Sequence, residues 1–189
     1  MATTSTDSMP PGTPAPTFTL PDVTTGKMRT LEELAGSAGT LIVFLCAHCP
    51  YVIHVREKLS ELAREFFPLG ISTLGISAND VLAYPDDSPE KLREMVERSN
   101  LPFPILYDEL QRVAASYTAA CTPDFFLFDA ARRLAYRGRL DASTPGNGLP
   151  INGEDLKNAM KAVVTRSAVT APWPPALGCS IKWKEKGRQ

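Results

Sequence analysis

The sequence predicts an α/β fold in which helices flank a mixed central sheet. Residues 41–45 form an apolar run that suits a strand buried on both faces. Apolar residues then recur at helical spacing after Pro50, and further strands and helices alternate before a hairpin. Because alternating strands and helices favour parallel strands and a hairpin adds antiparallel ones, these patterns together predict a layered domain with a mixed sheet.

The first half of the chain gives the clearest element signals. Residues 18–20 and 27–29 flank a turn and predict a small hairpin, and residues 31–34 predict one helical turn before Gly36. A helix after Pro50 is indicated by one apolar face, formed by Val52, Val55, Leu59, Leu62 and Phe66. Pro68 and Gly70 close this helix, and residues 71–77 predict a second strand.

The second half continues the same alternation. Ser88 suits a helix N-cap and Pro89 the first helical position, so a helix is expected through residue 98. A short extended piece should precede a helix over residues 109–117, with Leu110 on its inner side. The remaining expected elements are hairpin strands over 125–128 and 134–137, a helix over 154–164, and a mostly irregular end that carries Cys179.

Composition predicts one soluble globular domain over residues 17–185. Residues 1–16 are rich in Thr, Ser and Pro, which predicts a disordered tail. Hydrophobic residues make up 43% and charged residues 22%, and the net charge of −1 gives no reason to expect nucleic acid or a membrane as partner. No apolar run reaches the roughly 18 residues of a membrane span, and the start lacks the pattern of a signal peptide. We therefore expect a cytoplasmic protein whose four cysteines are largely reduced at rest.

The feature that carries chemistry is the segment Cys46-Ala47-His48-Cys49, which follows the predicted central strand directly. It places a C-x-x-C pair at a helix start, where unpaired N–H groups and a partial positive charge favour a thiolate. Such a dithiol can exchange with disulfides, provided that the two sulfurs lie close enough to link and that a substrate can reach them.

Several motifs together resemble the thioredoxin fold, with the insertion seen in TlpA-like proteins and peroxiredoxins. The closest resemblance is to the AhpC/TSA, peroxiredoxin-like redoxin group, and it spans roughly residues 17–185. The motifs that carry it are residues 46–52, Ser77-Ala78-Asn79-Asp80 with 84–90, Ala120-Cys121-Thr122-Pro123-Asp124-Phe125-Phe126, 136–141 and 178–183. It implies a thioredoxin-like sheet with that insertion and an N-terminal hairpin.

The resemblance also implies roles for individual residues. Cys46 would be the exposed, attacking thiol, and Cys49 the buried thiol that resolves the mixed disulfide. His48 holds the position of a histidine in DsbA, which the chain resembles only there, and would stabilise the Cys46 thiolate. The bond before Pro123 would be cis, and Thr122 would offer its backbone to an extended substrate.

The other two cysteines allow two interpretations. Cys121 is either a small buried apolar residue or a third redox thiol paired with Cys179, since four cysteines allow three pairings. Arg137 and Arg139 are interpreted as surface charges on an edge strand rather than as a peroxidatic arginine, and His54 as a packed or exposed helix residue rather than a ligand.

Three functions compete at this stage. A dithiol oxidoreductase would act on a disulfide-containing protein or a small thiol, with thioredoxin or glutathione as reductant and no cofactor or metal. A thiol peroxidase is less favoured, because the threonine of the P-x-x-x-T-x-x-C pattern falls on Cys46 or Val43 and no hydroxyl is supplied. A copper carrier of the Sco type would need a wider cysteine spacing and a distant histidine. Oligomeric state is left open.

Overall fold

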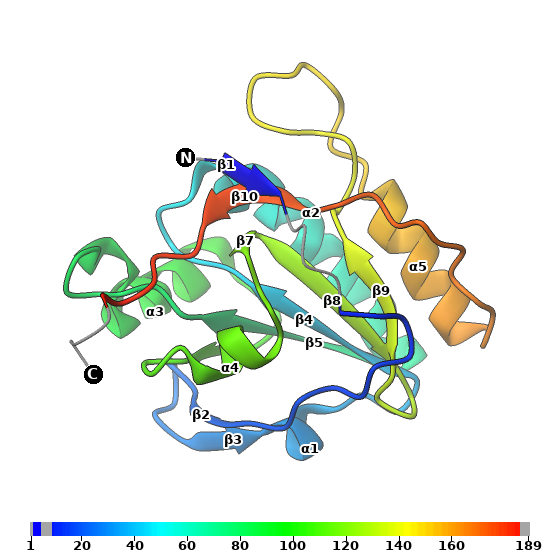
Figure 1. Ribbon diagram of the computed structural model, residues 1–189, viewed down its shortest axis with the longest axis horizontal. Coiled ribbons are helices and arrows are strands. Elements are labelled where there is room, and N and C mark those ends of the chain that lie inside the picture. Colours follow the sequence, from blue (N-terminus) through cyan, green and yellow to red (C-terminus); the bar gives the residue numbers. More distant parts are fainter. Residues whose placement is uncertain (1, 5–8, 186–189) are drawn as a thin grey trace.

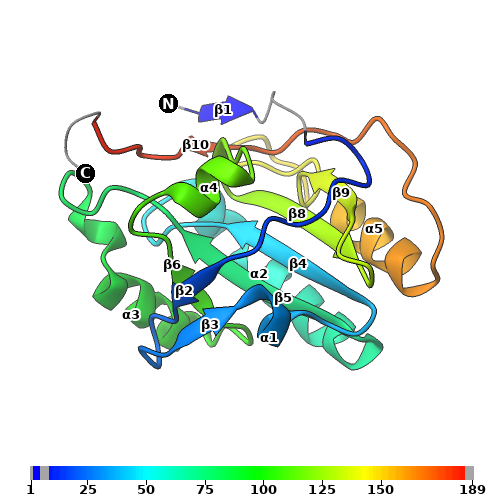
Figure 2. The same cartoon turned by 60° about the horizontal axis from the view of Figure 1, so that its bottom comes forward.

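The structure is a computed structural model that describes residues 2–4 and 9–185. Its centre is a sheet with strand order β6-β5-β4-β8-β9 (Figure 1, with β6 labelled in Figure 2). The first three of these strands are parallel, β8 runs antiparallel to β4, and β9 antiparallel to β8. The bounds are β4 Gly39–Phe44, β5 Ile71–Ser77, β6 Ile105–Tyr107, β8 Asp124–Asp129 and β9 Leu134–Gly138. The predicted mixed sheet is confirmed.

Helices cover both faces of this sheet (Figure 2). One face packs against α2 (Pro50–Phe66), α3 (Pro89–Ser99) and α5 (Glu154–Val164), and the other against α1 (Leu31–Leu34) and α4 (Arg112–Ser116). The side chains of β4 alternate between the two cores, with Leu41 and Val43 in the first and Ile42 and Phe44 in the second. A strand that is buried on both sides reads as a continuous apolar run, which explains the pattern at residues 41–45.

Helix starts and ends mostly follow the local signals. Two short 3-10 turns, Phe67–Leu69 and Pro85–Asp87, follow α2 and precede α3, and the Ser88 hydroxyl caps α3 by accepting from the Lys91 N–H at 3.4 Å. The helix predicted over residues 109–117 is shorter in the structure, because α4 begins only at Arg112. Gln111 adopts the left-handed backbone conformation with φ 59°, so Leu110 leaves the helix and is 56% exposed rather than inward.

The N-terminal segment corrects another expectation. The hairpin β2 (Thr19–Pro21) with β3 (Met28–Thr30) forms as predicted. The disordered tail predicted over residues 1–16 is wrong for residues 2–4, a strand that pairs with residues 177–179. It is also wrong for residues 9–16, which run along the β8–β9 turn, where Gly12 N–H donates to Leu134 O and Ala15 N–H to Arg132 O. The edge of a sheet presents unpaired N–H and C=O groups, which can hydrogen-bond to a neighbouring segment even when that segment has few apolar side chains. The prediction for residues 1 and 5–8 lies outside the described residues.

The C-terminal segment, expected to be mostly irregular, contains a strand. β10 (Leu177–Ser180) pairs antiparallel with β1 (Ala2–Thr4) on one side and with β7 (Cys121–Thr122) on the other. Figure 1 shows β10 between these strands and beside α2. The four residues of β10, which include Gly178, are too few to show an alternation of apolar and polar side chains, so this strand could not be predicted from the sequence. Over the described part of the chain, none of the helices combines the length and apolar character needed to cross a bilayer.

Candidate active site

Cys46 and Cys49 lie where β4 gives way to α2, as the sequence predicts. β4 ends at Phe44, Pro50 is the first residue of α2, and Cys49 is its N-cap residue. Both cysteines are free thiols, and one residue, Thr122, contacts the sulfurs of both. The structure therefore places the two sulfurs side by side at the start of α2.

Both thiols are buried, which corrects the expectation that Cys46 is exposed. Cys46 is 1% exposed and Cys49 0%. Thr122 on β7 contacts both sulfurs, and Cys179 on β10 pairs with Thr122 and packs against the core that contains the two thiols. The cover thus comes from segments that lie more than seventy residues away along the chain from the dithiol, at positions the local sequence could not indicate.

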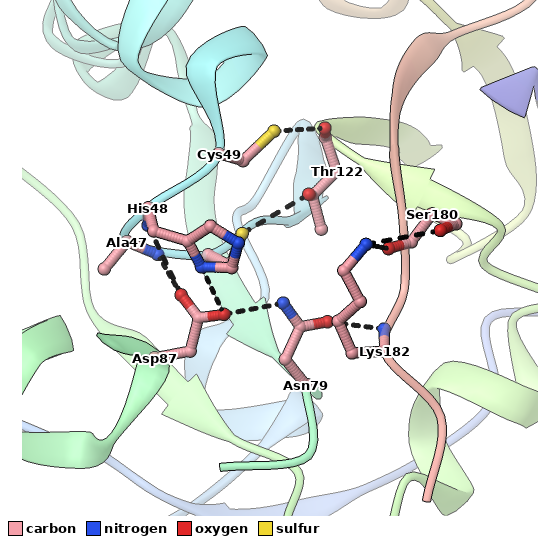
Figure 3. A network of polar contacts seen from close by, with 9 residues as sticks. Ala47, His48, Cys49, Asn79, Asp87, Thr122, Ser180 and Lys182 are labelled. Carbon is pink, nitrogen blue, oxygen red and sulfur yellow. Dashed lines mark hydrogen bonds and ion pairs between the residues drawn. The ribbon is translucent and has the colours of Figure 1, made fainter. Parts of the chain in front are cut away.

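The loop around Pro123 lies against the dithiol. The Thr122–Pro123 peptide bond is cis, as the resemblance implied. Thr122 Oγ1 is 3.4 Å from Cys46 Sγ, and the Thr122 carbonyl accepts a hydrogen bond from a protonated Cys49 at 3.1 Å (Figure 3). A single residue therefore contacts each sulfur, one through its side chain and the other through its backbone.

His48 is held by a buried carboxylate, Asp87, to which the sequence reading assigned no role. His48 Nδ1 lies 2.8 Å from Asp87 Oδ2, while the N–H groups of Ala47 and His48 donate to Oδ1 at 2.9 and 3.3 Å. Asn79 Nδ2 also donates to Asp87 Oδ2 at 2.7 Å (Figure 3). Asp87 is fully buried, so these contacts fix the loop between Cys46 and Cys49 on the segment that precedes α3.

The same network reaches the C-terminal segment and the solvent. Asn79 Oδ1 accepts from the backbone N–H of Lys182 at 2.8 Å, just beyond β10. The ring of Tyr84 stacks on His48 with 6.2 Å between centroids and 5° between planes, and Tyr84 is 41% exposed. Asp87 and Asn79 belong to motifs that carried the resemblance, but nothing in their local sequence indicates that they meet His48.

Of the two thiols, Cys49 is the more acidic. Its interactions with Cys46, Thr122 and Cys179 and the Val52 N–H lower the pKa of Cys49 against the opposing effect of burial. The pKa of Cys46 is raised by the neighbouring Cys49, by burial and by the nearby charge of Asp87. The surroundings therefore favour ionisation of Cys49 over that of Cys46, and ionisation gives up the hydrogen bond that the Cys49 thiol donates to the Thr122 carbonyl.

Cys121 and Cys179 occupy opposite faces of the small β1-β10-β7 sheet. Cys179 pairs with Thr122 and Ser180 with Cys121, and adjacent strand residues point to opposite faces. Cys121 is fully buried, its Sγ lies 3.6 Å from the Pro123 carbonyl, and burial raises its pKa. The register therefore does not favour a bond between these two cysteines, one of the alternatives left open by the sequence.

Arg137 corrects the interpretation of a surface charge. Its side chain is buried on β9, where Nη2 lies 3.0 Å from Asp124 Oδ2 and donates to the Thr118 carbonyl at 2.8 Å. Arg139, by contrast, is 38% exposed at its side chain and pairs with Asp155 at 2.7 Å. His54 hydrogen-bonds to Ser143 Oγ at 2.8 Å, as fits a packed helix residue.

A hollow of about 230 Å³ lies beyond Pro123. Tyr51, His54, Pro123 and Leu177 are among its lining residues, and within the described part of the chain no cysteine lines it. This hollow therefore gives no direct route to the buried pair.

The sheet order, the dithiol at the start of α2 and the cis-proline loop define a thioredoxin-fold redoxin. A model of the AhpC/TSA family matches residues 11–137, and the chain belongs to this family. The thioredoxin domain of a thiol-disulfide oxidoreductase from Bacteroides vulgatus shares the fold, with a TM-score of 0.64 and 21% identity over 83% of this chain and 99% of that one.

Two further relatives differ in what their descriptions say. A solved structure described as an uncharacterized conserved protein from Geobacillus kaustophilus is 44% identical, with a TM-score of 0.94 and coverage of 97% of both chains. A Mycobacterium tuberculosis protein that carries the name peroxiredoxin is 28% identical over 116 residues, which are 61% of this chain and 68% of that protein. The family match and the likeness to this second protein support an enzyme of redox type.

Proposed function

We propose that this protein is a thiol–disulfide oxidoreductase whose exchanging pair is Cys46 and Cys49. The observation that carries the proposal is the placement of both sulfurs at the start of α2, each in contact with Thr122 of the cis-proline loop. Loss of one proton from the pair leaves one sulfur as a thiolate, which is the form that attacks a disulfide.

In the proposed exchange, Cys46 attacks first. Cys46 is the thiolate when the pair's remaining proton is on Cys49, where it makes the hydrogen bond to the Thr122 carbonyl. The Cys46 thiolate attacks a substrate disulfide, forms a mixed disulfide and expels one substrate thiolate. Cys49 then attacks Cys46 Sγ, so that the Cys46–Cys49 bond forms and the second substrate thiolate leaves. The substrate gains two electrons and the dithiol loses them.

The site must open for this reaction, since both sulfurs are buried. Thr122, the residue proposed to pair with an extended substrate, is already paired with Cys179 of β10. A substrate strand would therefore replace β10 along β7. We propose a disulfide-containing protein or a small thiol as substrate, a thioredoxin-type protein or glutathione as reductant, and the cytoplasm as compartment.

The test compares Cys46→Ser and Cys49→Ser with Cys121→Ser, a matched change of a buried cysteine on the other face. Stopped-flow mixing of each reduced protein with a fluorogenic peptide disulfide follows release of the peptide thiol. We expect Cys121→Ser to retain the exchange rate, Cys46→Ser to lose it, and Cys49→Ser to stop at a mixed disulfide visible by mass spectrometry. Full exchange activity in both Cys46→Ser and Cys49→Ser would refute the proposal.

A peroxidase is the second candidate, and one contact favours it. Thr122 Oγ1, 3.4 Å from Cys46 Sγ, supplies the hydroxyl that the linear peroxidase pattern lacks. A peroxide would oxidise Cys46 to a sulfenic acid, and Cys49 would displace water to form the disulfide. If so, peroxide consumption should far exceed that of free cysteine and fall sharply in Thr122→Val. A rate equal to that of free cysteine excludes this activity.

Metal carriage, the third function weighed, has one supporting observation. Cys46, His48 and Asp87 offer a sulfur, an imidazole nitrogen and a carboxylate oxygen within 4.8 Å of one another. Both Asp87 oxygens already accept hydrogen bonds, which weakens this candidate. Copper or zinc retained at one equivalent after purification, and lost in His48→Ala, would support it. Protein that is purified without chelators and holds neither copper nor zinc would exclude metal carriage.

A further inference from the structure

Cys179 stands out because it is the one cysteine that both contacts the buried pair and reaches solvent. Of the four cysteines, Cys46, Cys49 and Cys121 are buried and only Cys179 is partly exposed. It packs against the core that contains the pair and lies opposite Thr122, the residue whose side chain and carbonyl contact Cys46 and Cys49. A reagent in solution therefore meets Cys179 before it can meet either buried sulfur.

The register of β10 explains this placement. Cys179 lies directly opposite Thr122, so its side chain is on the Thr122 face of the small sheet, the face whose Thr122 hydroxyl contacts Cys46. Gly178 allows this close pairing, because a Cβ there would lie 2.1 Å from the Thr122 carbonyl oxygen. β10 thus holds a thiol at the place along β7 where an incoming strand would present its own cysteine.

We propose that Cys179 is a third redox-active cysteine, which exchanges with Cys49 and connects the buried Cys46–Cys49 pair to thiols in solution. This inference rests on the proposed function, since it begins from the oxidised pair. The Cys179 thiolate attacks Cys49 Sγ, the Cys49–Cys179 bond forms and the Cys46–Cys49 bond breaks. Cys46 leaves as a thiolate and takes up the proton that Cys179 lost. No electrons enter or leave the protein in this step.

Reduction then proceeds from outside. A small thiol attacks the partly exposed Cys179 Sγ, forms a mixed disulfide and releases Cys49 as a thiolate. A second thiol reduces the mixed disulfide, so two electrons reach the dithiol without either buried sulfur being exposed. In this scheme β10 is the path by which the reductant reaches the site.

The electrostatics of the pair favour this order of events. Burial, followed by the proximity and negative charge of Cys49, raises the pKa of Cys179 to about 11, against a lowering by Lys182. When Cys49 enters a disulfide, its charge and its role as acceptor disappear. Oxidation of the pair therefore makes the Cys179 thiolate easier to form at the moment when it is needed.

The first test looks for the Cys49–Cys179 bond without using the proposed exchange activity. Reduced Cys46→Ser protein is oxidised with diamide, blocked with N-ethylmaleimide, digested with trypsin and analysed by mass spectrometry. Trypsin places Cys49, Cys179 and Cys121 in separate peptides, residues 30–56, 167–182 and 113–132. We expect peptide 30–56 to be linked to 167–182. The link should persist in Cys46→Ser/Cys121→Ser and vanish in Cys46→Ser/Cys179→Ser.

A second measurement tests the path of reduction. The oxidised protein is mixed with glutathione and quenched with N-ethylmaleimide at intervals, and free Cys46 and Cys49 are quantified. Because exchange rates depend on access, we expect Cys179→Ser to be at least about ten-fold slower than Cys121→Ser. Equal rates, or linkage of peptide 30–56 to 113–132 instead, would overturn the inference. Full exchange activity in both Cys46→Ser and Cys49→Ser would refute the proposed function, whereas the linked peptide would still be found or missed independently of that assay.

Discussion

Asp87 anchors the loop that carries the dithiol, and Asp87→Asn tests how much the site depends on it. One oxygen of this buried carboxylate accepts from the N–H groups of Ala47 and His48, and the other accepts from Asn79 Nδ2 and lies 2.8 Å from His48 Nδ1. Asparagine keeps the shape of the side chain but replaces one acceptor oxygen with a donor amide. The change therefore removes acceptors without opening a cavity.

The magnitude follows from these contacts. If the new amide takes the place of Oδ2, it faces the Asn79 amide, donor against donor; if it is flipped, it faces the two backbone N–H groups. Either way a buried donor loses its acceptor. Since a hydrogen bond to a charged group contributes about 1.5–3 kcal/mol and an unsatisfied buried group costs about 1–3 kcal/mol, we expect a loss of about 2–4 kcal/mol in the free energy of unfolding. Removing the Asp87 charge should also lower the pKa of Cys46, which that charge raises.

Urea unfolding of the reduced protein measures the first effect by linear extrapolation, and thiolate absorbance during a pH titration measures the second. The matched control is Asp86→Asn, the same chemical change at an exposed neighbour, which should stay within about 0.5 kcal/mol of the unsubstituted protein. If Asp87→Asn proved as stable as Asp86→Asn, the carboxylate would not hold the loop as argued here.

Three other perturbations address separate parts of the molecule. Arg137→Met should lower the free energy of unfolding, measured in urea, by about 3–5 kcal/mol, because it leaves Asp124 buried without its cation. Adding Asp124→Asn to Arg137→Met should restore part of that stability, and no restoration would contradict the pairing of Arg137 with Asp124. Gly178→Ala should push β10 away from Thr122 and speed alkylation of the buried pair by N-ethylmaleimide, whereas an unchanged rate would mean that β10 is not the cover. The pKa of Cys49 is lowered to about 4 in the folded protein, against about 8.5 for a free thiol. Stability relative to Cys49→Ser should therefore rise as pH increases between these values and fall away as pH drops toward the lower one. A stability difference that does not change with pH would argue against an ionised Cys49.

Much of the fold could be predicted because its elements carry their own signals. β5 and α5 have the predicted bounds, and α2 follows its apolar periodicity from Pro50 to Phe66. These elements bury a face against one central sheet, so hydrophobic pattern alone is informative. β10 carried no such signal. Its partners β1 and β7 are far away in sequence, and backbone pairing rather than side-chain pattern defines it.

The site divides in the same way. The motif at residues 46–49 and the Thr122–Pro123 pair could be predicted because each is a local sequence with a recognisable structural setting. Burial of Cys46 and the contact between Asp87 and His48 could not, because they depend on segments that meet only in the folded chain. An aspartate in a polar loop gives no sign that its carboxylate will be enclosed.

Both thiols are buried because β10 pairs with β7 and covers them. Only two residue pairs join these strands, Cys179 with Thr122 and Ser180 with Cys121. Each backbone hydrogen bond contributes about 0.5–1.5 kcal/mol net to stability, so separating β10 from β7 costs little free energy. An incoming strand that forms the same hydrogen bonds with β7 offsets that cost. The contact between Lys182 and Asn79 adds to the cost and links it to the loop held by Asp87. A protein substrate can therefore displace β10 and reach Cys46, whereas a small thiol, whether substrate or reductant, makes no strand pairing and enters through Cys179.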